Sequence, residues 1–409
     1  METSLSDTGI KVLSCKNCIT GENENISFSN GLLLSVEKTG ENNSRFYTAP
    51  GLTDLQINGI NGIDFNDTAL TADDVISATE YLLSRGVTTF YPTVITNSEE
   101  SIIALLGTIV KACEIDPLVN SCIAGIHLEG PFISPANGAK GAHDELYIKA
   151  PDWELFKKFQ EAAKGSIKIV TISPEWSNAE DFIKKCVQSG VIVSIGHSIA
   201  SSTQISNAVK AGACMSTHIG NGVPLMLARH PNIIWDQLSK DELYACIIAD
   251  GIHIPDAFIK VVQKTKQHKT MIVSDATCFA GMKPGAYTRH IGGDVVLDEN
   301  KSVSLKAEPG ILAGAAKSLP ENVETLLEHK LFDLKTAWQM ASVNIQDFLL
   351  HNSTGYTAPV NDMVIFTRND TSIDIETVVK NGAIVFLNDG AWAVSGGFEQ
   401  ITTTCNHKS

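Results

Sequence analysis

Positive charge is scarce in this sequence. Lysine and arginine together number 31 against 46 aspartate and glutamate residues, which gives the 409 residues a formal net charge of −15. Surfaces that bind nucleic acid or anionic membranes need clustered positive charge. The charge balance therefore argues against both kinds of partner. It is compatible with a small anionic substrate, but such a substrate would need a local positive pocket on an acidic protein.

Long apolar runs are also missing. No uninterrupted apolar stretch approaches the ~20 residues that a membrane-spanning helix needs, and residues 1–9 lack both the basic and the apolar region of a secretory signal. The nine cysteines are an odd number scattered along a long chain, which is typical of reduced thiols. Cys15 and Cys18 have CxxC spacing without a second pair, so we assign them no role. We predict a cytoplasmic, globular protein of enzyme size.

Short β-branched runs alternate with amphipathic stretches through most of the chain. The eight candidate strands are residues 52–58, 86–93, 123–129, 167–173, 191–197, 214–218, 244–250 and 271–275. The intervening helical stretches include residues 72–84, 98–113, 153–163, 178–189, 203–211 and 256–266. Because parallel strands need helical crossovers outside the sheet, this alternation predicts an α/β fold with a (β/α)₈ barrel. An open doubly wound sheet fits the same alternation, but the GxGxxG that would favour it is absent after the early strands.

The two ends of the chain have a different pattern. Short strand-like pieces broken by Gly, Asn and Glu occupy residues 11–17, 25–28, 32–37, 363–367 and 377–387. The last of these contains the turn-like pair Asn381-Gly382. We predict that residues 1–49 and 358–409 together build one small β-sandwich, and that residues 50–357 form the barrel.

Polar side chains end four of the predicted barrel strands. These residues are Glu129, His197, His218 and Asp275, and each follows an apolar run and precedes turn chemistry. The carboxyl ends of barrel strands converge on one face, so residues distant in sequence meet there. Two imidazoles and a carboxylate form a three-ligand set for a zinc-like metal that leaves one position open for water. A carboxylate that is not needed as a ligand is free to act as a general base.

Five segments resemble a known family. They are His127-Leu128-Glu129-Gly130-Pro131, Gly196-His197-Ser198, Thr217-His218, Ala249-Asp250-Gly251-Ile252-His253 and Ser274-Asp275-Ala276-Thr277. In this order they are similar to the marker segments of the N-acetylglucosamine-6-phosphate deacetylases, which belong to the amidohydrolase superfamily. The resemblance implies a metal-dependent barrel with a flanking β-sandwich. It also implies Glu129, His197 and His218 as metal ligands and Asp275 as the catalytic acid and base.

The first barrel strand bears on the number of metals. Many amidohydrolases carry His-x-His there and hold a second metal, whereas this chain has Gln56 and Asn58, whose neutral amides are poor ligands for a transition metal. Family members with this Gln-x-Asn pattern generally work with one metal. The resemblance thus implies one divalent ion per subunit, zinc first, with iron, manganese or cobalt as alternatives. It also implies a homodimer.

The resemblance further implies where a phosphosugar binds. The positions that match are Ala142, His143, Asn221, Gly222, Arg229, Asp250, His253, Leu312, Ala313 and Gly314. Arg229 suits a forked contact to phosphate, His143 would stabilise an oxyanion, and residues 312–314 would line the acetyl end of the pocket. Where the family usually has Asn-Ala-Met after the second histidine ligand, this chain has Asn221-Gly222-Val223, which predicts a more flexible loop.

The expected reaction is hydrolysis of the N-acetyl group of N-acetylglucosamine 6-phosphate to glucosamine 6-phosphate and acetate, in amino-sugar catabolism or recycling. A second hypothesis keeps the barrel and the metal but changes the substrate to N-acetylgalactosamine 6-phosphate, a D-aminoacyl compound or a cyclic amide. Arg229 discriminates here, because an uncharged substrate would not depend on it. A third hypothesis is an inactive barrel kept as a sensor or scaffold, against which the intact metal-and-base set argues.

Overall fold

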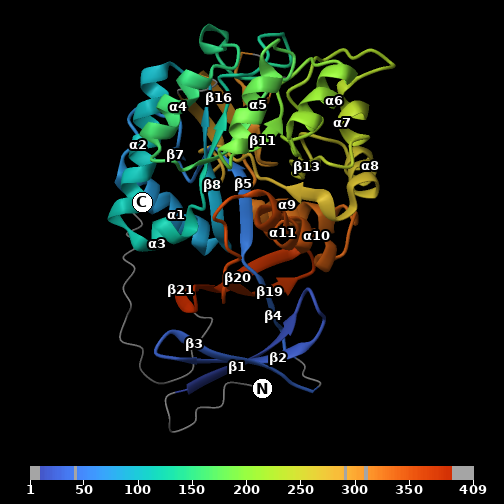
Figure 1. Ribbon diagram of the computed structural model, residues 1–409. Helices are drawn as coiled ribbons and strands as arrows, with labels where there is room; N and C mark the ends of the chain where they lie inside the picture. The colour runs from blue at the N-terminus through green and yellow to red at the C-terminus, as the bar shows by residue number, and fades with distance from the viewer. Residues whose placement is uncertain (1–9, 41–43, 290–292, 308–311, 389–409) are drawn as a thin grey trace.

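Eight parallel strands form the centre of the molecule (Figure 1). The computed structural model describes residues 10–40, 44–289, 293–307 and 312–388. The strands pair in the order β14-β13-β12-β11-β10-β9-β8-β5, and a parallel bridge between Ile57 and Ala276 joins the two ends of the sheet. Their bounds are β5 (Leu52–Ile57), β8 (Val87–Ile95), β9 (Ile126–Glu129), β10 (Ile167–Ile172), β11 (Ile192–Ile195), β12 (Met215–Ser216), β13 (Tyr244–Ile247) and β14 (Thr270–Ile272). The predicted (β/α)₈ barrel is confirmed.

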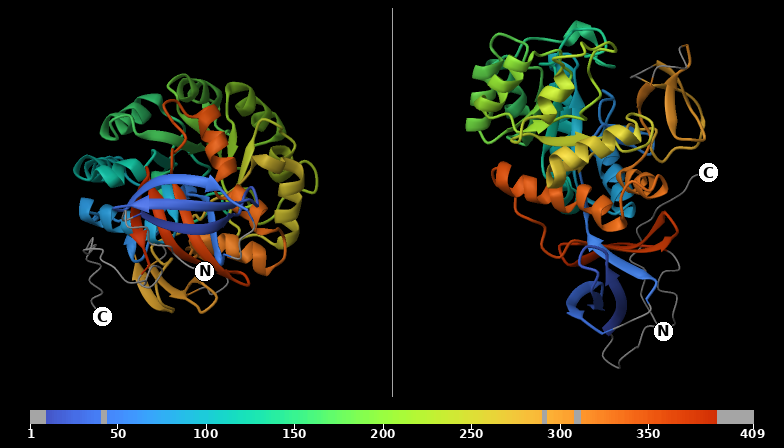
Figure 2. Two further views of the ribbon diagram at one scale, coloured as in Figure 1. Left: turned by 90° about the horizontal axis from the view of Figure 1, so that it is seen from below. Right: turned by 90° about the vertical axis from the view of Figure 1, so that its right-hand side faces the viewer.

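Helices surround this barrel, as the view along its axis shows (Figure 2). They are α1 (Ala72–Ser84), α2 (Glu99–Ile115), α3 (Pro117–Cys122), α4 (Trp153–Ala162), α5 (Ala179–Gln188), α6 (Ser202–Ala211), α7 (Ile233–Leu238), α8 (Asp256–Lys266), α9 (Leu319–Glu328), α10 (Leu334–Met340) and α11 (Val343–Asn352). Local signals fix their ends: a capping box of Ser201 and Gln204 starts α6, and Gly212 in the left-handed region ends it. Within the described part of the chain, none of these helices combines the length and apolar character that a membrane span requires.

The two ends of the chain build one sheet below the barrel (Figure 1). Its strands are β1 (Ile10–Asn17), β2 (Asn23–Ser29), β3 (Leu32–Lys38), β4 (Phe46–Pro50), β19 (Met363–Asn369), β20 (Ser372–Lys380) and β21 (Ala383–Leu387). The sheet closes on itself because β1 pairs in parallel with β4. Trp338 of α10 stacks on Phe366 of β19 at 4.8 Å between ring centroids and donates to Pro50 O at 2.9 Å. These contacts attach the terminal sheet to the barrel.

A four-stranded antiparallel sheet follows the last barrel strand. It consists of β15 (Gly285–Arg289), β16 (Gly293–Leu297), β17 (Ser302–Leu305) and β18 (Leu312–Ala315), in that order. Phe279, Val295, Leu297 and Val303 form its own small core. A parallel bridge from Ala315 to Ala276 returns the chain to the barrel, so β18 lies beside the carboxyl end of β14. The sequence analysis did not predict this sheet.

The cysteines bear on the expected reduced state only in part. Eight of the nine lie within the described residues, and no disulfide joins any two of these eight, while Cys405 lies outside them. Burial raises the pKa of the Cys15 thiol, and it raises the pKa of Cys18 to about 12. A reactive or metal-binding cysteine has a lowered pKa, so these values give no support to a role for this pair.

Candidate functional site

A cavity of about 630 Å³ opens at the carboxyl ends of the barrel strands. Twelve of the fourteen predicted site residues line it: Glu129, Ala142, His143, His197, His218, Asn221, Gly222, His253, Asp275, Leu312, Ala313 and Gly314. Asp250 and Arg229 are the two that do not. The lining also includes residues that the sequence analysis did not select, among them Asp64, Ile248, Thr277 and Phe279.

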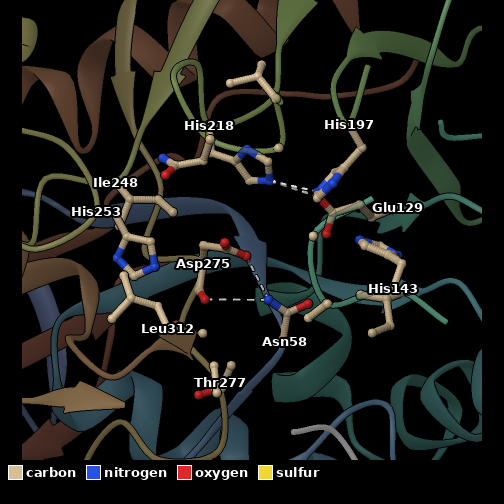
Figure 3. A pocket seen from close by; sticks show the side chains of 18 of the residues that line it. Asn58, Glu129, His143, His197, His218, Ile248, His253, Asp275, Thr277 and Leu312 are labelled. Atoms are coloured by element: carbon tan, nitrogen blue, oxygen red, sulfur yellow. Dashed lines mark hydrogen bonds and ion pairs between the residues drawn. The ribbon is translucent and has the colours of Figure 1, made fainter. Parts of the chain in front are cut away.

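Glu129, His197 and His218 meet at one point of this cavity (Figure 3). Glu129 Oε1 lies 3.0 Å from the Nε2 atoms of both histidines, and these two Nε2 atoms are 3.2 Å apart. All three side chains are buried. Burial alone would raise the pKa of Glu129, but the hydrogen bonds and charges of the two histidines hold it well below its usual range. The carboxyl group is therefore ionised.

The tautomer of His197 tests whether this cluster suits a cation. Its Nδ1 lies 2.8 Å from the carbonyl oxygen of Ala139. A carbonyl can only accept, so Nδ1 carries a hydrogen, and in the neutral form of the ring the lone pair of Nε2 is the one directed at Glu129 and His218. A carboxylate oxygen and two ring nitrogens within 3.2 Å of one another form the donor set that a divalent metal needs. The residues fit a metal ion.

His143 also borders the cluster. The centroid of its ring lies 4.4 Å from the centroid of the His197 ring. One of its ring nitrogens lies within 4.8 Å of a carboxylate oxygen of Glu129 and of a ring nitrogen of His197. Its Nδ1, however, is 2.8 Å from the hydroxyl of Thr96. Burial lowers the pKa of His143 to about 3, so the ring is neutral. A threonine hydroxyl can donate or accept; if Thr96 donates to Nδ1, the hydrogen of the ring is on Nε2.

Of the four polar residues that end barrel strands (Glu129, His197, His218 and Asp275), three have an unusual backbone conformation. His197, His218 and Asp275 have φ values of 46°, 25° and 47°, in the left-handed region that residues other than glycine rarely adopt. Each stands just after a short strand, β11, β12 or β14, where the chain turns out of the barrel. Such strained residues cluster at active sites. Three of the four selected positions thus have this backbone conformation, which nine other non-glycine residues of the described chain share.

Two amides from the first strand hold Asp275. Its Oδ1 accepts a hydrogen bond from Asn58 Nδ2 at 2.7 Å (Figure 3) and another from Gln56 Nε2 at 3.0 Å. Gln56 Nε2 also donates to Glu129 Oε1 at 3.0 Å. The amide of Gln56 thus presents its hydrogens, not a lone pair, to the two carboxylates. Burial raises the pKa of Asp275 to about 6, which leaves it ionised at neutral pH.

His253 is oriented by Asp250. The Asp250 carboxylate is buried; it accepts from His253 Nδ1 at 2.6 Å and from the backbone N–H groups of Ile252 and His253 at 2.8 and 2.9 Å. Burial would raise the pKa of Asp250, but these hydrogen bonds and the charge of His253 lower it. Asp250 therefore acts behind His253, whose ring lines the cavity.

The loop after His218 gives the cavity unpaired donors. Asn221 Nδ2 is buried and has no hydrogen-bond partner among the described residues. Gly222 has φ +60, and a Cβ there would lie 3.0 Å from the His197 ring. Glycine at this position therefore allows the loop to pass close to the Nδ1 side of that ring without displacing it.

Arg229 lies elsewhere. It is exposed and is not part of the cavity lining. The lining holds three carboxyl groups, Asp64, Glu129 and Asp275, and no lysine or arginine among the described residues. The positive pocket expected from the sequence is therefore not formed by Arg229 in a single chain.

One contact of the site could not be foreseen from the sequence. Thr96 holds His143, and it follows β8 without any motif around it. Its approach depends on Gly130, where a Cβ would lie 2.1 Å from the Thr96 hydroxyl. The sequence feature that bears on this contact is Gly130, which the sequence pattern indicated only as part of the turn after Glu129.

The chain is similar to curated N-acetylglucosamine-6-phosphate deacetylases. It is 34% identical to the *Bacillus subtilis* enzyme over 282 residues, which cover 68% of this chain and 69% of that protein. It is 30% identical to the human enzyme over 355 residues, or 84% of each chain. The solved structure of a *Mycobacterium smegmatis* deacetylase mutant, in complex with N-acetyl-D-glucosamine-6-phosphate, matches with a TM-score of 0.78 at 22% identity, over 91% of this chain and 98% of that one. No family model matches the chain.

Proposed function

The chain belongs to the N-acetylglucosamine-6-phosphate deacetylase family, and from this premise we propose that it hydrolyses N-acetylglucosamine 6-phosphate to glucosamine 6-phosphate and acetate. The convergence of Glu129, His197 and His218 beside Asp275 carries the proposal, because these residues supply both a metal site and a base. The *Mycobacterium smegmatis* relative was solved with this phosphosugar bound, which supports the choice of substrate.

We propose Glu129, His197 and His218 as the residues that hold one divalent metal, with zinc as the first candidate. His218 is preferred over His143 as the third ligand because its Nε2 lies 3.0 Å from Glu129 Oε1, whereas His143 Nδ1 is engaged by Thr96. Gln56 adds no ligand, since its amide hydrogens face the carboxylates. When bound, the metal would supply Lewis-acid polarisation and an acidified water.

The chain's own groups would move the protons. Asp275, ionised and held by Asn58 and Gln56, accepts the proton of the attacking water. His143 donates from Nε2 to the oxygen that becomes negative as the acetyl carbonyl turns tetrahedral. Asp275 then returns the proton to the sugar nitrogen, because an amine anion cannot leave. Acetate and the free amine result.

The phosphate group of the substrate would bind at the end of the cavity away from the proposed metal site. Asn221 Nδ2 has no partner and can donate to an anion, and His253, oriented by Asp250, can do the same. We keep Arg229 as a proposed phosphate contact from the exposed loop that follows His218. A homodimer is likewise proposed from the family resemblance. Leu312, Ala313 and Gly314 would line the acetyl end.

Acetate release from three sugars tests the proposal. We expect turnover of N-acetylglucosamine 6-phosphate, slower turnover of its C4 epimer N-acetylgalactosamine 6-phosphate, and little turnover of unphosphorylated N-acetylglucosamine. Equal rates with and without the phosphate would contradict the phosphosugar assignment. Faster turnover of the epimer would favour the alternative substrate.

A further inference from the structure

Four buried side chains form a continuous hydrogen-bonded chain one layer beneath the proposed metal site. We call His127, Thr171, Thr217 and Ser194 the belt. His127 Nε2 lies 2.7 Å from Thr171 Oγ1, and Thr171 Oγ1 lies 2.7 Å from Thr217 Oγ1. Thr217 Oγ1 in turn lies 2.5 Å from Ser194 Oγ. All four residues are buried, and they come from the strands or strand ends of β9, β10, β12 and β11.

The belt is anchored at one end to the first barrel strand. His127 Nδ1 lies 3.0 Å from the carbonyl oxygen of Leu55, so Nδ1 must donate. Either oxygen can be the donor in each of the two hydroxyl–hydroxyl bonds, and both threonine hydroxyls have two partners within the belt. The belt is thus one continuous chain that ends on the first barrel strand.

The belt touches the backbone beside all three proposed ligands. His127 lies two residues before Glu129, on the same strand face, and Thr217 directly precedes His218. The third contact is through Gly196, which precedes His197: a Cβ there would lie 2.7 Å from Thr217 Cβ and 2.8 Å from Thr171 Cγ2. The ligand-bearing loop of His197 therefore rests directly on the two threonines.

Four other buried hydroxyls in this barrel have no such arrangement. The side-chain oxygens of Thr53, Thr89, Ser216 and Thr270 are buried and have no hydrogen-bond partner among the described residues. Burial in the barrel does not by itself link hydroxyls into a chain. Ser173 and Ser198 form a separate linked pair at 2.7 Å, whereas the belt joins three hydroxyls and a histidine beneath the proposed ligands.

We propose that the belt is a positioning device for the metal ligands: it fixes the spacing of the strand ends that carry Glu129, His197 and His218. The inference rests on the proposed metal site and goes beyond it, because none of the four belt side chains would touch the metal or the substrate. Breaking the chain at its centre lets the strand ends shift relative to one another, and a three-ligand site is sensitive to such shifts.

The experiment compares Thr171→Val, which keeps the shape but breaks the belt, with Thr171→Ser, which keeps the hydroxyl. Thr89→Val is the matched control, since it removes a buried hydroxyl of the same barrel that has no partner. Zinc affinity is measured by competition with a chelator, and the melting temperature of each metal-free protein is measured alongside. We expect Thr171→Val to weaken zinc binding about tenfold or more, with Thr171→Ser and Thr89→Val close to wild type.

Zinc affinity of Thr171→Val within about twofold of wild type would overturn the inference, whatever the loss in melting temperature. If this variant does not fold, Ser194→Ala takes its place, because it removes only the last hydroxyl of the belt. Zinc binding at least about threefold weaker supports the belt, and unchanged binding overturns it. Failure of the wild type to bind zinc or another divalent metal would instead contradict the proposed function.

Discussion

Asp275 combines a strained backbone with a fixed side chain. Its φ of 47° places it in the left-handed region, which costs of order 1–3 kcal/mol and persists only where the surroundings hold it. Two amides, Gln56 and Asn58, hold the carboxylate. The position of Oδ1 is therefore set before a substrate arrives, as a general base requires.

Asp275→Asn should abolish turnover without removing the metal. Asparagine keeps the size of the side chain but cannot accept a proton, so we expect kcat to fall about 10²–10⁴-fold while metal content stays at the wild-type level. Acetate release and elemental analysis measure the two quantities. Asp73→Asn, exposed at the start of α1, is the control. Full activity of Asp275→Asn would exclude it as the base.

Asp54 should make stability depend on pH. Burial raises the pKa of this carboxyl to about 7, whereas the unfolded chain has the ordinary value of about 4. Between these values the folded state binds the extra proton, so stability falls as pH rises from about 4 to about 7. Removing the charge should remove this loss.

We therefore expect the melting temperature of Asp54→Asn, relative to wild type, to be a few °C higher at pH 8 than at pH 5. Scanning calorimetry at the two pH values measures the difference, with Asp73→Asn as the exposed control. A difference between variant and wild type that is the same at both pH values would show that Asp54 is ionised in the folded protein throughout this range.

At the level of single residues, the sequence pattern located the side chains that end strands and missed those that support them. Glu129, His197 and His218 each follow an apolar run, which is visible in sequence. The contact of Thr96 with His143 depends on two loops that meet only in the fold. Arg229 was selected for its charge near a ligand strand, and only the fold shows that it is exposed and outside the lining, although Leu227 of the same loop lines the cavity.

At the level of elements, a glycine after β9 sets the distance between two loops. Gly130 has φ +87, and a Cβ would lie 2.1 Å from the hydroxyl of Thr96. Because Thr96 holds His143, displacement of this hydroxyl would release the histidine. The turn after Glu129 is thus coupled to the residue that we propose for the oxyanion.

Gly130→Ala should lower both stability and kcat. Gly165→Ala is the matched control, because Gly165 has φ +81 but open space around it. The control should cost only the left-handed strain of about 1–2 kcal/mol, with kcat unchanged. Urea unfolding and acetate release separate the two effects. If both variants keep wild-type kcat, the contact between Thr96 and His143 does not serve catalysis.

The barrel elements were predictable and the inserted sheet was not, for a physical reason. Barrel strands are buried on both faces, so they appear as continuous β-branched runs between helices. Strands β16, β17 and β18 bury only one or two residues each, and the sheet covers only a small core. So sparse an apolar pattern resembles loop sequence, and only the completed fold shows that Leu312 to Gly314 are part of a strand at the cavity.

On the scale of the whole molecule, the charge of −15 opposes a dianionic substrate. The cavity lining holds no lysine or arginine among the described residues. Cationic groups outside the lining are therefore needed to attract the anionic substrate to the cavity. Arg229, on the exposed loop beyond Asn221, is the one that the sequence and the family resemblance select. Its loss should weaken binding more than chemistry.

For Arg229→Ala we expect KM for N-acetylglucosamine 6-phosphate to rise about tenfold or more, as for loss of a charged hydrogen bond of about 1.5–3 kcal/mol, with little change in kcat. Arg368→Ala, an exposed arginine of the terminal sheet, is the control. Steady-state kinetics measure both. An unchanged KM would remove Arg229 from the proposed phosphate site.

We propose that one metal, held by Glu129, His197 and His218, makes this barrel a deacetylase. The most direct test is to strip the protein with a chelator, return zinc in measured amounts, and record acetate release from N-acetylglucosamine 6-phosphate at each step. We predict no activity in the stripped protein and a linear return of activity that saturates at about one metal per chain. Full activity of the stripped protein, or saturation only at two metals, would contradict the account.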